Sequence, residues 1–161
     1  MKDMPSPDLK FTLDVHLGKL TRFLRLFGFD AFWDANYNDK EIILFSLSEG
    51  RIILTRDRGL LANKSVIHGY RVLSQNPDDQ LREVFIHFGL KCCIKPFSRC
   101  MECNGILKKA RKEDIIERLS PKTIEYYNTF IRCTNCDRIY WEGSHYERMK
   151  KYIESVIKDV N

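Results

Sequence analysis

Two Cys-x-x-Cys turns, Cys100 to Cys103 and Cys133 to Cys136, have the spacing of a tetrahedral zinc site. A gap of two residues lets both thiolates of one turn face the same ion, and the 29 residues between the turns suffice for a small sheet that returns the second pair. Asn104 and Gly105 are expected to supply the positive φ angles that such a turn needs. Four thiolates leave no coordination position for water, so we expect the zinc to stabilise the fold. The alternative is two redox or disulfide pairs.

Acidic residues near the ends of three predicted strands suggest a second, catalytic metal site. Asp14, Asp34 and Asp57 stand at or just after these ends, and Asp39 begins a predicted helix. Because the carboxyl ends of parallel strands share one edge of a sheet, three or four of these acids are expected to converge there. Mg²⁺ or Mn²⁺ would relieve their repulsion and activate a water for phosphodiester hydrolysis. The alternative is that Asp34, Asp39 and Asp57 only form turns and helix caps, whereas Asp14 has no turn to make.

The formal net charge of +5 has most of its excess in the second half of the chain. Residues 1–94 hold 13 Lys and Arg against 12 Asp and Glu, and residues 95–161 hold 14 against 10. Bulk charge is weak support for nucleic-acid binding, but cations and aromatic rings beside the cysteine turns suit phosphates and bases. A solvated basic rim is the alternative interpretation. The candidate RNA contacts are Arg99, Arg132, Arg138, Tyr140, Trp141 and His145.

The N-terminal segment and the remaining cysteines bear on the compartment. Met1–Lys10 carries charges and two prolines and lacks the apolar core of a secretion signal, and no run approaches the ~18 apolar residues of a membrane span. We therefore expect a cytoplasmic protein with no membrane association. In a reducing compartment Cys92 and Cys93 are expected to be free thiols that are buried as apolar residues.

Strand and helix signals alternate through the first half and predict a small parallel sheet with helices on both faces, a three-layer α/β domain. The expected strands are Lys10–Val15, Phe29–Trp33, Arg51–Thr55 and Tyr70–Leu73. The expected helices are Leu17–Phe27, Asn38–Glu49, Gly59–Asn63 and Pro77–Phe88, with Gly28 and Gly50 as C-terminal stops.

The second half is expected to form a zinc ribbon around the cysteine turns. Strands are predicted at Thr129–Arg132 and Arg138–Trp141, with short helical or irregular insertions at Lys112–Leu119 and Pro121–Tyr127. A helix after Gly143 has an apolar stripe that is expected to dock on the protein and not on a membrane. The expected units are an α/β domain at residues 9–92, a ribbon at 96–149 and a C-terminal helix at 145–161.

Several motifs follow one another along the chain. They are Lys10-Phe-Thr-Leu-Asp14, Leu17-Gly-Lys-Leu-Thr-Arg-Phe-Leu-Arg-Leu-Phe-Gly-Phe-Asp30, Asp39-Lys-Glu-Ile, Ile53-Leu-Thr-Arg-Asp57 and, after the second cysteine turn, Trp141-Glu-Gly-Ser-His145. In this order, with the two cysteine turns, they resemble the Mut-seven C-terminal RNase domain family over about residues 9–149. The resemblance implies a PIN-like nuclease domain fused to a zinc ribbon.

The resemblance also implies roles for individual residues. Asp14, Asp39 and Asp57 map to the acids that hold a catalytic Mg²⁺ or Mn²⁺, and Asp34 is a candidate fourth acid. Thr55 and Arg56 map to residues that support Asp57. One difference is that the segment from Asp34 to Asn38 is poorer in acids than in relatives.

A metal-dependent ribonuclease is the function that these features favour, with the zinc ribbon aiding RNA binding. Ribosomal RNA and tRNA are candidate substrates, and ribosome association is a candidate context. The main alternative is a non-catalytic RNA-binding or ribosome-associated adaptor, because a nuclease fold can persist after its metal affinity is lost. The toxin of a toxin–antitoxin pair is a third hypothesis.

Overall fold

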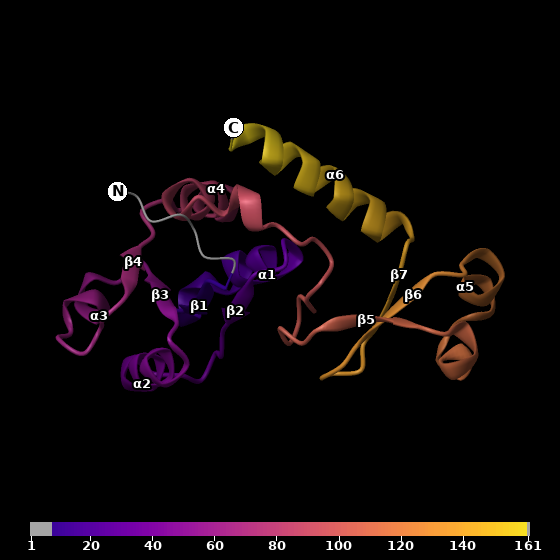
Figure 1. Ribbon diagram of the computed structural model, residues 1–161, viewed down its shortest axis with the longest axis horizontal. Helices are drawn as coiled ribbons and strands as arrows, with labels where there is room; N and C mark the ends of the chain where they lie inside the picture. The colour runs from indigo at the N-terminus through magenta and orange to yellow at the C-terminus, as the bar shows by residue number, and fades with distance from the viewer. Residues whose placement is uncertain (1–7, 161) are drawn as a thin grey trace.

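A computed structural model describes residues 8–160 and shows a mixed α/β protein with two sheets (Figure 1). The first sheet is parallel, has the strand order β2-β1-β3-β4, and consists of β1 (Lys10–Leu13), β2 (Asp30–Phe32), β3 (Ile52–Thr55) and β4 (Gly69–Arg71). The second is antiparallel and consists of β5 (Leu107–Ala110), β6 (Phe130–Cys133) and β7 (Ile139–Trp141). The predicted fold class, a small parallel sheet followed by a cysteine-bearing ribbon and a helix, is confirmed.

The helices alternate with the strands of the first sheet and then continue into the ribbon. They are α1 (Gly18–Leu26), α2 (Asp39–Glu49), α3 (Arg58–Ala62), α4 (Pro77–Phe88), α5 (Pro121–Tyr126) and α6 (Ser144–Asp159). Short 3₁₀ helices occur at Val15–Leu17, Leu90–Cys93, Lys112–Asp114 and Ile116–Arg118. Within residues 8–160 there is no helix with the length and apolar character needed to cross a bilayer.

The parallel sheet is covered on both faces, which gives the expected three layers. Because side chains alternate along a strand, Leu54 of β3 joins one core and its neighbour Ile53 joins the other. The larger core includes side chains from α1, α4 and α6, whereas Ile42 of α2 and Leu60 of α3 belong to the smaller one. Figure 1 shows α1 and α4 on one side of the sheet and α2 on the other.

Capping residues explain where two of the sheet-covering helices begin and end. Asn38 accepts a hydrogen bond from the Glu41 N–H, and Glu41 accepts one from the Asn38 N–H, so α2 begins with a reciprocal capping box. Gly50 ends this helix at φ 62°, a left-handed angle that glycine adopts readily. Asn76 caps α4 by accepting a hydrogen bond from the Asp78 N–H, Pro77 occupies the first turn, and Gly89 ends the helix in the left-handed region.

The C-terminal helix α6 returns from the ribbon and lies along the α/β half (Figure 1). Ile153 and Val156 are buried in the larger core, which confirms that the apolar stripe docks on the protein. At the same contact the Tyr152 hydroxyl donates a 2.6 Å hydrogen bond to Asp78. The helix is therefore part of the α/β core, while the boundaries of the three units remain predictions.

Three local predictions differ from the structure. Strand β1 ends at Leu13, so Asp14 lies just beyond it at the start of a 3₁₀ turn. The basic strand β5 was not predicted, because its Leu-Lys-Lys-Ala sequence carries little apolar signal. The prediction that Cys92 and Cys93 are buried is wrong: Cys92 is exposed and Cys93 is intermediate, since the 3₁₀ turn leaves them at the surface.

Candidate functional site

The four predicted zinc ligands come together in the ribbon. Their sulfur atoms all lie within 4.8 Å of one another, and among residues 8–160 they are the one set of three or more candidate ligands this close. The Sγ atoms of Cys100 and Cys136 are 3.7 Å apart, and those of Cys103 and Cys133 are 3.4 Å apart. A zinc ion bound by four thiolates at about 2.3 Å places its ligands roughly 3.8 Å apart. The cysteines therefore fit a tetrahedral zinc ion.

Both cysteine turns use the same backbone geometry. The residue after the second cysteine has a left-handed φ in each turn, 69° at Asn104 and 65° at Asp137. Gly105 was expected to share this conformation, but the positive-φ glycines are others. Its requirement is one of space, because a Cβ at Gly105 would lie 2.8 Å from the Cys133 sulfur. The small residue thus lets the first turn approach the second pair of ligands.

The environment of the sulfurs favours one thiolate and opposes a second. Although burial opposes ionisation, hydrogen bonds from the Asn135 side chain and the Gly105 N–H lower the pKa of Cys103 to about 6. Burial and contacts with the other thiols raise the pKa of Cys136 to about 12. Four sulfurs at this spacing cannot all be ionised without a cation, so a divalent ion would relieve their repulsion.

Arg25 joins the first cysteine turn to the α/β half. Its side chain is buried in α1, with Nε donating to the Ala31 carbonyl at 2.8 Å. Its Nη1 donates to the carbonyls of Met101 and Glu102, at 3.1 and 2.9 Å, inside the cysteine turn. Sequence reasoning missed this contact. The available signal was an arginine on the apolar side of a predicted helix, eight residues after Leu17 and four after Thr21.

Asn104 completes the junction by covering an open strand edge. Strand β2 is at the border of the sheet, where its outer backbone groups lack a neighbouring strand. The Asn104 side chain accepts from the Ala31 N–H at 3.2 Å and donates to Asp30 at 2.8 Å. The metal-binding turn therefore satisfies a backbone N–H of β2 that a neighbouring strand would otherwise have to pair.

Asp30 is the charged centre of the same junction. Arg51 pairs with it at 2.6 Å and Arg99 at 3.4 Å. Burial would raise the pKa of Asp30, but hydrogen bonds from Arg51 and Asn104 outweigh it and lower that pKa below its usual range. Arg99, a predicted RNA contact, is thus held by Asp30 and also donates to the Asn104 carbonyl at 2.9 Å.

The predicted acidic edge lies where the strand order changes direction, between β1 and β3. Asp14 is 6% exposed there, and it accepts a 2.8 Å hydrogen bond from the Thr55 hydroxyl. The same hydroxyl accepts from the Asp57 N–H at 2.9 Å, so Thr55 links the two acids. Asp57 also caps α3 by accepting from the Gly59 N–H at 2.6 Å.

The other predicted acids are less closely drawn together. Asp34 accepts from the Asn36 N–H at 2.8 Å in a local turn, and Asp39 is exposed in the first turn of α2. Among the described residues, no three acids bring carboxylate oxygens within 4.8 Å of one another. Arg56 is exposed, and its carbonyl accepts from Arg71 at 3.4 Å.

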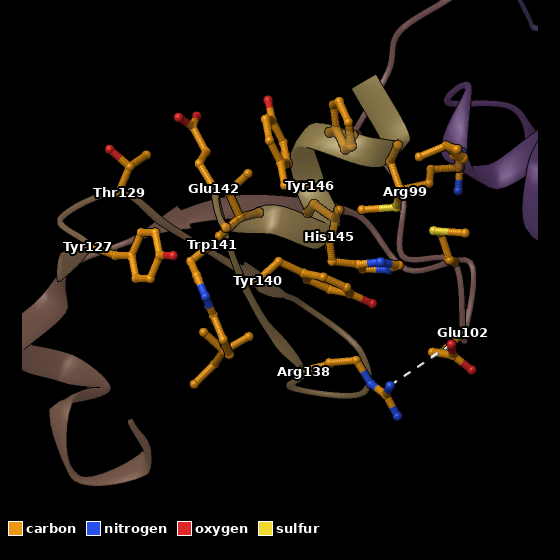
Figure 2. A pocket seen from close by; sticks show the side chains of 18 of the residues that line it. Arg99, Glu102, Tyr127, Thr129, Arg138, Tyr140, Trp141, Glu142, His145 and Tyr146 are labelled. Atoms are coloured by element: carbon orange, nitrogen blue, oxygen red, sulfur yellow. Dashed lines mark ion pairs between the residues drawn. The ribbon is translucent and has the colours of Figure 1, made fainter. Parts of the chain in front are cut away.

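Most of the predicted RNA contacts line one cavity of about 510 Å³ between the ribbon, α1 and the start of α6 (Figure 2). They are Arg99, Arg138, Tyr140, Trp141 and His145. Arg132 lies apart, in an open groove with Lys108 and Lys109, and forms an ion pair with Asp137. Arg22 and Tyr127 also line the cavity and were missed, because Arg22 belongs to the α/β half of the sequence and Tyr127 ends the insertion predicted at Pro121–Tyr127.

A family model described as Mut7-C RNAse domain matches residues 9–153. The chain belongs to this family. The match runs from β1 into α6, so it includes the acidic edge, the four cysteines and the cavity. Membership confirms the resemblance seen in the sequence and supports a nuclease-like function with RNA as the substrate class. No curated protein and no solved structure matches the chain.

Proposed function

We propose that the protein is a metal-dependent ribonuclease whose active site is the acidic edge between β1 and β3. The observation that carries this proposal is the state of Asp14. Its carboxylate is buried, and within residues 8–160 it has a hydrogen bond from Thr55 but no ion pair. A buried carboxylate is costly without a compensating charge, and a divalent cation would supply that charge.

The residues at this edge fit a Mg²⁺ or Mn²⁺ ion that keeps several water or phosphate ligands, and not an ion enclosed by protein ligands alone. Mg²⁺ takes one or two carboxylates and keeps several waters or phosphate oxygens, so Asp14 and Asp57 suffice as direct ligands. Asp39 would then act through water or orient the attacking water, with Asp34 as a further acid. When bound, the metal lowers the pKa of a water and stabilises charge on the phosphate.

The chain's own residues have separate tasks in this proposal. Thr55 donates its hydroxyl proton to Asp14 and accepts from the Asp57 backbone, which fixes the Asp14 carboxylate and the turn that carries Asp57. The zinc ion, closed by four thiolates, would hold the ribbon against the α/β half and take no part in hydrolysis.

Cleavage of labelled RNA in the presence of Mn²⁺ tests the proposal. Asp14→Asn should abolish cleavage, and Thr55→Val should lower the rate about 10- to 100-fold, as expected for a residue that orients a metal ligand. Glu49→Gln is the matched control, because Glu49 is an exposed acid at the end of α2. If the wild type cut RNA no faster than Asp14→Asn, the enzymatic function would be refuted and the RNA-binding adaptor would replace it.

A further inference from the structure

We propose that the cavity between the ribbon and the start of α6 binds an unpaired nucleotide of the RNA substrate, with its base against aromatic rings and its phosphate at arginines. The inference rests on the proposed function for the identity of the ligand as RNA. The cavity has a volume of about 510 Å³, which is in the range of pockets that enclose small organic groups.

Two aromatic rings at one end of the cavity have faces that are not covered by another ring. Tyr127 and Trp141 have centroids 6.5 Å apart and planes tilted by 43°, so neither ring covers the other as a stacked pair. Trp141 is 38% exposed. By contrast, Phe97 and Tyr146 are stacked on each other at 4.3 Å, so their facing surfaces are occupied. An unpaired base can therefore stack on Tyr127 or Trp141.

Cations stand at another part of the wall (Figure 2). Arg138 points to Glu102 at 3.9 Å, and Arg22 pairs with the same carboxylate at 2.7 Å. Both arginine side chains are about half exposed, 56% for Arg138 and 49% for Arg22. Ion pairs this exposed contribute little stability, so either guanidinium can turn to a phosphate, which it binds through two parallel hydrogen bonds.

The start of α6 lines the same cavity as these arginines. Gly143 is its N-cap and provides no side-chain acceptor, so the first-turn N–H groups of the helix have no cap at the cavity wall. These donors add to the attraction for a phosphate. Aromatic faces and phosphate donors in one cavity match a nucleotide, and the faces of paired bases are hidden in a duplex.

Helix α1 connects this cavity with the acidic edge. The chain leaves Asp14, makes one 3₁₀ turn and enters α1, whose Arg22 lines the cavity. Gly18 and Arg22 are one helical turn, or about 6 Å, apart along the axis. A single strand held at the cavity would run along α1 to reach the acids that are proposed to cleave it.

Binding measurements in the Asp14→Asn background, without added divalent metal, test the inference separately from cleavage. The probes are a fluorescent eight-nucleotide single strand of RNA, the same sequence as a duplex, and inorganic polyphosphate, which has charge but no bases. Trp141→Ala should weaken single-strand binding about 5- to 150-fold, the range for loss of one stacked base, and leave polyphosphate binding unchanged. Tyr126→Ala is the matched control, because Tyr126 is 69% exposed on α5 and does not line the cavity.

A second variant guards against a folding defect in Trp141→Ala. Thr129 is an exposed residue on the cavity wall, so Thr129→Trp should fill the cavity without removing a core contact and should weaken single-strand binding as well. The inference is overturned if both variants bind the single strand as tightly as Tyr126→Ala, or if they weaken polyphosphate equally. If the wild type does not cleave RNA, but single-strand binding is weakened by Trp141→Ala, the proposed function is refuted and the cavity assignment stands.

Discussion

Replacing Asn104 by glycine tests how firmly the zinc-binding turn is joined to the α/β half. Glycine keeps the left-handed backbone at φ 69° without strain, so Asn104→Gly removes only the side-chain contacts. The Ala31 N–H, in a residue with no solvent exposure, would lose its acceptor, at a cost of about 1–3 kcal/mol. Asp30 would lose one of its charge-assisted hydrogen bonds but keep Arg51. Together these losses destabilise the protein by about 2–5 kcal/mol.

Thermal unfolding with the zinc content measured in parallel gives the readout. A chain of this size loses about 2–4 °C per kcal/mol, so the Tm of Asn104→Gly should fall by about 4–20 °C. Asp137→Gly is the matched control, because Asp137 has the equivalent backbone angle in the second turn and makes exposed ion pairs with Arg118 and Arg132. Those pairs are worth about 0–1 kcal/mol. Equal Tm losses in the two variants, with zinc retained in both, would refute the proposed junction.

Three further predictions concern the metal and the junction. Removal of zinc by a strong chelator should destabilise both halves in one cooperative transition, because Arg25 and Asn104 tie the metal-binding turn to β2; two well-separated calorimetric transitions would contradict this. Cys103→Ser should lower the zinc content, whereas Cys92→Ser should leave it at one equivalent, as metal analysis of purified protein can check. Asp30 has a lowered pKa in the folded state, so its stabilisation is present above the unfolded pKa and is lost as the pH falls through the folded pKa. Urea unfolding between neutral and acidic pH should therefore show a smaller loss of stability in Asp30→Asn than in the wild type.

The sequence predicted those parts of the fold that depend on local signals. The helix from Pro77 to Phe88 was predicted with its observed bounds, because Pro77 and the acidic pair Asp78-Asp79 mark its start. The four cysteines were predicted as one cluster because their spacing fixes the geometry of each turn. Strand β5 was missed because Leu-Lys-Lys-Ala has a weak strand signal of its own. The segment is a strand because it pairs with β6.

The contacts between distant segments could not be predicted in the same way. Asn104 was expected to shape the backbone of a metal turn, and it does, but its side chain also bonds to a residue 73 positions away in the chain. The predicted RNA contact Arg99 is likewise held by Asp30, which no spacing rule connects to it. Such partners follow from how the two sheets are placed, and this placement is a property of the tertiary structure.

Helix α1 explains how three separate features come to share one arrangement. Its start follows Asp14, its buried Arg25 holds the carbonyls of the first cysteine turn, and its exposed Arg22 lines the cavity. Arg22 and Arg25 are three residues apart and so lie on neighbouring parts of the helix surface. Arg22 pairs with the Glu102 side chain, and Arg25 donates to the ribbon backbone. A rotation of α1 would therefore move the acidic edge, the zinc turn and the cavity together. This shared dependence gives a physical reason why one family unit includes both the α/β half and the ribbon.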